Sequence, residues 1–234
     1  PLEKARKKKL QIHWKPEMIQ KPKKMGVTYF KDYDLSSLVE YINWDPFFHT
    51  WQLRGKYPNR GYPKIFRDKS CGEQAKELFD KAQVMLKDII DKKLLKARGV
   101  IAFYPCNSVN EDDIELYEDD SREKTLGKLY MLRQQQETED GIYFAQSDFV
   151  APKETGITDY IGMFACSAGF GQDELVEKYK EDHDDYSIIM LKALSDRLAE
   201  AMAEKLHEEV RKDYWGYAPD EKLTNKTIYT NYQG

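Results

Sequence analysis

Two carboxylates four residues apart, Asp196 and Glu200, are the side chains of this sequence best suited to chemistry. They lie in the segment LKALSDRLAEAMAEKL, where apolar residues recur at helical spacing: Leu191, Leu194, Leu198, Met202 and Leu206. On a helix the two carboxylates are neighbours, roughly opposite this apolar stripe. The pattern is typical of a solvated helix face, but two adjacent carboxylates can also hold a cationic ligand through charge-assisted hydrogen bonds.

Two aromatic clusters could form the wall of such a site, because a cation is attracted to the face of an aromatic ring. One cluster follows the helical segment and contains Tyr214, Trp215 and Tyr217. The other is NWDPFFHTW, whose rings are spaced mostly three or four apart: Trp44, Phe47, Phe48 and Trp51. That spacing favours core packing for the second cluster, whereas we interpret the first as a binding wall.

The run EDHDDY places His183 among acidic residues, and a metal site is one interpretation. Contiguous side chains point in different directions and give poor tetrahedral geometry, so we predict no metal ligands there. Asp184 or Asp185 is better explained as the N-cap of the following helix. The run SAGFGQDE, which includes Gln172, either offers backbone N–H groups to a ligand or is a plain strand-to-helix turn.

The composition indicates a soluble protein, with 234 residues, 33% charged residues and a formal net charge of −4. A general nucleic-acid binder would usually be basic overall. No stretch approaches the roughly 18 apolar residues of a membrane span, and the N-terminus lacks the apolar core of a signal peptide. The three cysteines, Cys71, Cys106 and Cys166, form no CxxC pair, which suits a reducing compartment. We therefore predict a cytoplasmic protein.

The elements that must position these residues are predicted to form an α+β fold. We expect residues 1–31 to form a linker or extended arm outside the core, and residues 110–120 to form a charged loop. Two predicted helices begin after N-caps at Asp34 and Asp45. The others cover residues 72–92, 173–181 and 186–214. The predicted strands cover residues 97–105, 126–132, 142–149 and 159–165. Because the strands follow one another with few helices between them, we expect an antiparallel sheet.

Several segments together resemble the C-terminal activation domain of the cobalamin-dependent methionine synthases. They are YINWDPFFHTWQLRGKYPNRGYPKIF, ARGVIAFYPCNSVNEDDIELY, LRQQQE, SDFVAPKETGITDYIGMFA and HDDYSIIMLKALSDRLAEAMAEKLHEEVRKDYWGYAP. The similarity covers residues 32–234. The RGKYPNRGYPKIF loop of this sequence resembles that of animal-type members of the family. Residues 1–31 resemble the linker that follows the preceding cobalamin-binding domain. The resemblance implies a C-shaped α+β domain with a twisted antiparallel sheet, flanking helices and a long C-terminal amphipathic helix.

The resemblance also implies an activity. Enzymes of this family are methyltransferases that act in methionine biosynthesis, moving a methyl group from methyltetrahydrofolate to homocysteine through cobalamin. Their activation domain binds S-adenosylmethionine for the reductive methylation of inactive cob(II)alamin, with one electron from a flavoprotein reductase. The implied partners are that reductase and the cobalamin-binding domain of the same protein. Cobalamin and zinc would be held by other domains.

The family's site residues can be carried over position by position. Glu200 and Asn43 match the S-adenosylmethionine site, whereas Asp196 and Gln172 match residues that contact cobalamin. The family usually has aspartate at the position of Asn43, and carboxylates occur at those of Gln172 and Thr230. An amide at position 43 retains an acceptor but loses the charge, so we expect a weaker hold on an ammonium group. No residue of this chain is expected to be catalytic.

In the family, the NYQG sequence continues into an RPAxGYP segment that contributes to the S-adenosylmethionine site, whereas this sequence ends at Gly234. We therefore expect a fragment truncated at its C-terminal end, inactive alone in the overall methyl transfer and weak in ligand binding. One alternative is a non-catalytic interaction module that docks a reductase or the cobalamin domain through residues 111–120 or the basic N-terminal arm. Another is a metal-dependent hydrolase that uses His183.

Overall fold

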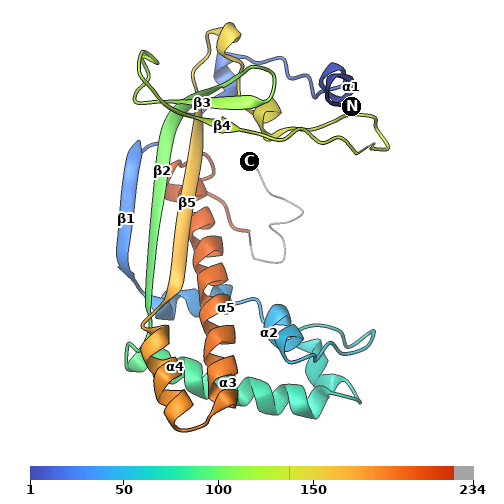
Figure 1. The fold of residues 1–234 in the computed structure, drawn as a ribbon, viewed down its shortest axis with the longest axis vertical. Coiled ribbons are helices and arrows are strands. Elements are labelled where there is room, and N and C mark those ends of the chain that lie inside the picture. Colours follow the sequence, from blue (N-terminus) through green and yellow to red (C-terminus); the bar gives the residue numbers. More distant parts are fainter. Residues whose placement is uncertain (137, 224–234) are drawn as a thin grey trace. The chain divides into compact units, whose positions relative to one another are not determined.

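The computed structural model describes residues 1–136 and 138–223 of the chain (Figure 1). These residues form two compact units, each built from segments that are distant in sequence. Unit 1 contains Pro1–Thr28, Ile101–Met163 and Arg211–Asp220, whereas unit 2 contains Tyr29–Val100, Phe164–Val210 and residues 221–223 of the described chain. All four site residues predicted within the described chain lie in unit 2; Thr230 lies outside the described residues.

The elements combine helices with one five-stranded sheet. The strands are β1 (Gly26–Tyr33), β2 (Lys96–Val109), β3 (Asp113–Tyr117), β4 (Thr125–Tyr130) and β5 (Asp159–Phe170). The α-helices are α1 (Leu2–Lys7), α2 (Asp45–Thr50), α3 (Gly72–Asp91), α4 (Gln172–Glu181) and α5 (Asp185–Glu209), and a π-helical turn, Val210–Tyr214, follows α5. The strand order is β1-β2-β3-β4, and β5 pairs with β2. The predicted α+β class, with a long C-terminal helix, is confirmed.

In unit 1, β3 pairs antiparallel with both β2 and β4. The register places Ile114 opposite Leu129, while Cys106 lies opposite Leu116. Side chains alternate between the two faces of a strand, so one face collects the apolar residues. The result is a buried cluster of Cys106, Ile114, Leu116 and Val150, against which Leu129, Met131, Ile161 and Met163 pack.

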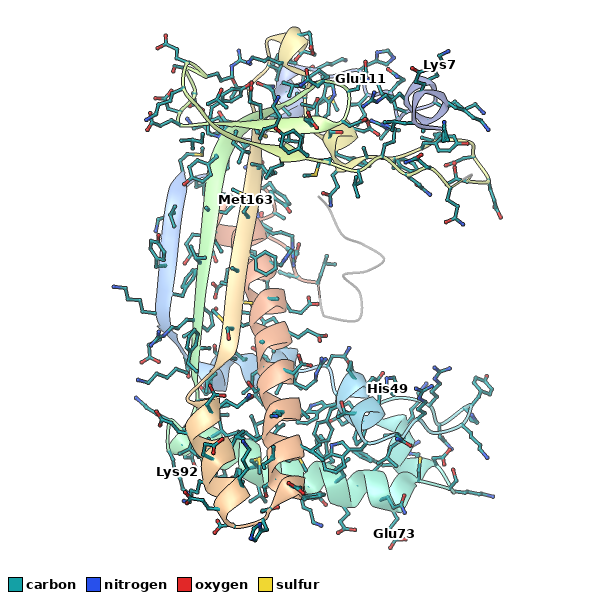
Figure 2. The ribbon with its side chains drawn as sticks, viewed as in Figure 1. Lys7, His49, Glu73, Lys92, Glu111 and Met163 are labelled. Carbon is teal, nitrogen blue, oxygen red and sulfur yellow. The ribbon has the colours of Figure 1, made fainter. Side chains whose placement is uncertain are left out.

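In unit 2, α5 packs against α2, α3, α4 and the 3₁₀ helix Leu35–Tyr41. The predicted helix of residues 72–92 is confirmed as α3, whose apolar positions Ala75, Leu78, Ala82, Leu86 and Ile89 are buried. Its ends, marked by Glu73 and Lys92 in Figure 2, carry an acid in the first turn and a base at the C-cap, which complements the helix dipole. These packed helices hold α5 in place.

Three sequence predictions need correction. Residues 142–149 form no strand, because their backbone groups bond elsewhere: the Tyr143 N–H donates to the Lys8 carbonyl, and Gln146–Phe149 is a 3₁₀ helix. The charged run 110–120 contains β3, since its alternating Ile114 and Leu116 are buried. The expected arm of residues 1–31 contains α1, in which Ala5 is buried, and most of β1.

No helix in the described part of the chain is long and apolar enough to cross a membrane.

Candidate functional site

The helix α5 presents the two carboxylates that the sequence singled out. It begins at its predicted N-cap, since the Asp184 side chain accepts hydrogen bonds from the backbone N–H and the hydroxyl of Ser187, at 2.9 and 2.6 Å. These bonds hold the pKa of Asp184 below its usual value. The predicted apolar stripe is confirmed as buried: Leu191, Leu194, Leu198, Met202 and Leu206. The remaining face of α5 is therefore free to carry polar groups.

The C-terminal end of α5 is anchored by two tyrosine hydroxyls. Tyr33 donates to a Glu209 oxygen and Tyr41 to a Glu208 oxygen, each at 2.6 Å. Burial is the largest of the causes that raise the pKa of Tyr41, followed by its bond to Glu208, so this hydroxyl stays a donor at neutral pH. Both contacts limit rotation of α5 about its axis and so fix the direction of its polar face.

Asp196 and Glu200 lie on that polar face with a buried arginine between them. Their side chains are 72% and 42% exposed, whereas the Arg197 side chain is only 9% exposed. The guanidinium reaches both carboxylates, at 2.6 Å from Asp196 Oδ2 and 2.5 Å from Glu200 Oε2. The three groups together carry a formal charge of −1, so the cluster suits a cationic ligand.

Gln172 lies at the first residue of α4, beside the turn that the sequence marked with glycines. A Cβ added at Gly169 would lie 2.9 Å from the Ser195 hydroxyl and 3.9 Å from the Gln172 side-chain oxygen. The end of β5 thus approaches α5 closely at the residue before Asp196. Gly169 therefore lies close both to Ser195 of α5 and to the side chain of Gln172.

Asn43 lies in the short connection between the 3₁₀ helix Leu35–Tyr41 and α2, and its side chain is exposed. Its Oδ1 accepts a hydrogen bond from the Asp45 N–H at 3.1 Å. Asp45 was predicted to be the N-cap of α2, but it is the first residue of that helix. Its carboxylate instead accepts from the Tyr62 N–H at 2.5 Å, because the 54–66 loop folds back onto it.

The structure joins two of the four predicted residues, Asp196 and Glu200, through one shared arginine, Arg197. Gln172 and Ser195 both lie close to Gly169, within 3.9 and 2.9 Å of the position that a Cβ there would take. Asn43 shares their unit and makes its hydrogen bond within its own turn. Sequence reasoning missed Arg197, although its position between two carboxylates in the run DRLAE is a readable signal.

The aromatic clusters are used for packing. Trp44, Phe47 and Phe48 are buried, which confirms the core interpretation for these three rings. Trp51 is half-buried, and its ring lies 4.9 Å from that of Tyr186. In unit 1 the Trp215 ring lies 5.6 Å from that of Phe103, and its indole N–H donates to the Gln20 carbonyl at 2.7 Å. The role of Trp215 as a wall of the ligand site stays a prediction.

His183 and the cysteines were the other candidates for chemistry. Among the described residues, no group of three His, Cys, Asp or Glu side chains is placed to hold a metal ion. All three cysteines are free thiols. Burial raises the pKa of Cys106 and of Cys166, which disfavours the thiolate needed for nucleophilic attack.

Comparison with known proteins identifies close relatives of this architecture. Residues 34–234 match the family model described as vitamin B12 dependent methionine synthase, activation domain. The chain is also similar to a crystal structure of the MetH reactivation domain bound to AdoHcy, with 43% sequence identity and a TM-score of 0.92. That alignment covers 100% of this chain and 70% of the matched chain.

Proposed function

We propose, from the premise that this chain belongs to the family of vitamin B12 dependent methionine synthase activation domains, that it binds S-adenosylmethionine to reactivate methionine synthase. The observation that carries this proposal is the pair of carboxylates on the polar face of α5, held by one buried arginine. The matched structure has AdoHcy bound, and AdoHcy retains the amino-acid ammonium group of S-adenosylmethionine. A carboxylate that keeps an open, exposed side suits such a group.

The four site residues divide between two ligands in this proposal. Glu200 and Asn43 hold S-adenosylmethionine: the first by its charge, and the second by an exposed amide whose orientation the Asp45 N–H fixes. Asp196 and Gln172 face the cobalamin of another domain, whose amide side chains can donate to a carboxylate and exchange hydrogen bonds with an amide. Cobalamin supplies the methyl-carrying chemistry when it is present. The residues of this chain bind and orient.

We further propose that residues 1–31 lead from the cobalamin-binding domain of the same protein, and that residues 32–234 form the activation domain. The methyltransferase as a whole transfers the methyl group from methyltetrahydrofolate to homocysteine in the cytoplasm, and zinc serves one of its other domains. A flavoprotein reductase is the proposed electron donor for reactivation. The match of the family model from residue 34 onwards supports this division.

Calorimetric titration of S-adenosylmethionine tests the proposal, in this chain and in the same chain continued by the family's RPAxGYP segment. We expect Glu200→Gln to weaken binding by about tenfold or more, the size of one charge-assisted hydrogen bond. Glu77→Gln is the matched control, because Glu77 is also an exposed helix carboxylate, paired with Lys81 on α3. This control should bind as the unchanged chain does.

Failure of both chains to bind at millimolar ligand would reject the proposal and favour the interaction module. An equal loss of affinity in the Glu77 and Glu200 variants would reject the role of Glu200 alone.

A further inference from the structure

In the cluster of Asp196, Arg197 and Glu200, the family resemblance implies a role for each carboxylate but none for Arg197. Its side chain is more than nine-tenths buried, whereas the two carboxylates beside it are 72% and 42% exposed. Arginine side chains in proteins carry a positive charge. A buried, permanent positive charge therefore lies directly beneath two carboxylates that face outwards.

The two contacts of Arg197 are not equivalent. Its Nη2 donates a hydrogen bond to Asp196 Oδ2 at 2.6 Å. Its Nη1 lies 2.5 Å from Glu200 Oε2, yet the angles are not those of a hydrogen bond, and this nitrogen has no hydrogen-bond partner among the described residues. A short distance alone reflects charge attraction, whereas a hydrogen bond also requires the donor and acceptor to be aligned. The guanidinium is thus both hydrogen-bonded and ion-paired to Asp196, whereas it is only ion-paired to Glu200.

This asymmetry has a consequence for the charge that Glu200 presents. A guanidinium shared between two carboxylates neutralises each of them in part. When Asp196 holds it, Glu200 keeps more of its negative charge and more of its free lone pairs for a cation outside the protein. When Asp196 is neutralised or engaged elsewhere, the guanidinium can turn fully to Glu200 and compete with that cation.

We propose that Arg197 is a positioning residue that couples the two halves of the site, so that Asp196 sets the charge that Glu200 offers to a cationic ligand. This inference rests on the proposed function, because it assigns the ligand's ammonium group to Glu200. By linkage, any group that binds Asp196 changes the affinity at Glu200, and the ligand at Glu200 changes the affinity at Asp196 equally. The ligand affinities at the two carboxylates are thus coupled through the side chain of Arg197.

A double-mutant cycle tests the coupling, with S-adenosylmethionine titrated calorimetrically into the continued chain described above. We expect Asp196→Asn to weaken binding by about fivefold when Arg197 is present, the lower end of couplings between linked sites. In the Arg197→Met background the same change should alter affinity by about twofold or less, the range of independent sites. A purely structural Arg197 would lower the unfolding temperature without producing this difference.

One control variant and one replacement variant accompany this cycle. Asp88→Asn removes an exposed carboxylate paired with Lys92 on α3, and it should leave affinity unchanged in both backgrounds. If Arg197→Met does not fold, Arg197→Gln replaces it, because an amide keeps hydrogen-bond donors but carries no charge to share between the carboxylates. The Asp196→Asn effect should then also shrink.

Equal effects of Asp196→Asn in both backgrounds would overturn the coupling and leave the proposed function intact. If the continued chain without substitutions does not bind S-adenosylmethionine, the proposed function is rejected, and the coupling with it.

Discussion

At the scale of the residue, Asn43, a proposed ligand residue, shows how one side-chain group can change the local charge without altering the fold. Its Oδ1 accepts the Asp45 N–H at 3.1 Å, a bond that an aspartate carboxylate accepts equally well. The side chain is exposed, so a charge there carries little desolvation cost. Replacement of the amide by a carboxylate therefore changes the charge of the site and little else.

We expect Asn43→Asp to tighten S-adenosylmethionine binding by about tenfold, because a carboxylate binds an ammonium group by a charge-assisted hydrogen bond. Calorimetric titration measures the affinity, and thermal unfolding should show little change in stability. Asn43→Ser retains an acceptor without the charge and should bring no gain. Equal affinity of the asparagine and aspartate forms would show that residue 43 does not contact the ligand cation.

At the scale of the element, the turn from β5 into α4 determines where Gln172, the first residue of α4, lies. Gly171 is the N-cap of α4 and has a φ of +96°, a backbone conformation that residues with a Cβ rarely adopt. A Cβ at this position would also lie 2.7 Å from the Leu94 carbonyl oxygen. Only glycine satisfies both conditions without moving the backbone.

We therefore expect Gly171→Ala to lower the free energy of unfolding by about 1–3 kcal/mol, through backbone strain and the clash with Leu94. Urea denaturation measures this loss. Gly127→Ala on β4 is the matched control, because a Cβ there meets nothing within 4 Å. Similar losses for both variants would mean that the conformation of the turn is not the cause.

At the scale of the whole molecule, unit 1 is held by a buried ion-pair hub that lies far from the candidate site in sequence. The Arg133 side chain is fully buried and its N–H groups bond to Asp112, Asp148 and the carbonyls of Tyr143 and Glu111. Burial by itself raises the pKa of Asp112, but its bonds to Arg6 and Arg133 outweigh burial and lower it. The hub therefore ties α1 and the 131–149 segment to the β2–β3 turn.

We expect Arg133→Met to cost about 3–5 kcal/mol of folding free energy, because it leaves two buried carboxylates without their main counter-ion. Hydrogen exchange should then accelerate mainly in unit 1. Lys153→Met removes an exposed partner of Glu115 in the same unit and should cost about 1 kcal/mol or less. An exchange increase spread evenly over both units would contradict a hub confined to unit 1.

The sequence by itself predicted the elements whose signal is local. The apolar periodicity of α3 and α5, the N-cap at Asp184 and the exposed side of Asp196 and Glu200 all depend on residues within a few positions of one another. The family resemblance also followed from contiguous segments, and the comparisons confirmed it. Such features need no knowledge of what lies opposite them in the fold.

The tertiary structure decided what depends on distant partners. Residues 142–149 read as a strand, but the backbone groups of Tyr143 bond to Lys8 and Arg133, which lie outside this segment and which no local pattern reveals. The burial of Arg197 beneath two carboxylates likewise arises from the packing of α5 against its neighbours. A charged side chain in a helix reads as exposed until its surroundings are known, because burial is a property of the whole fold.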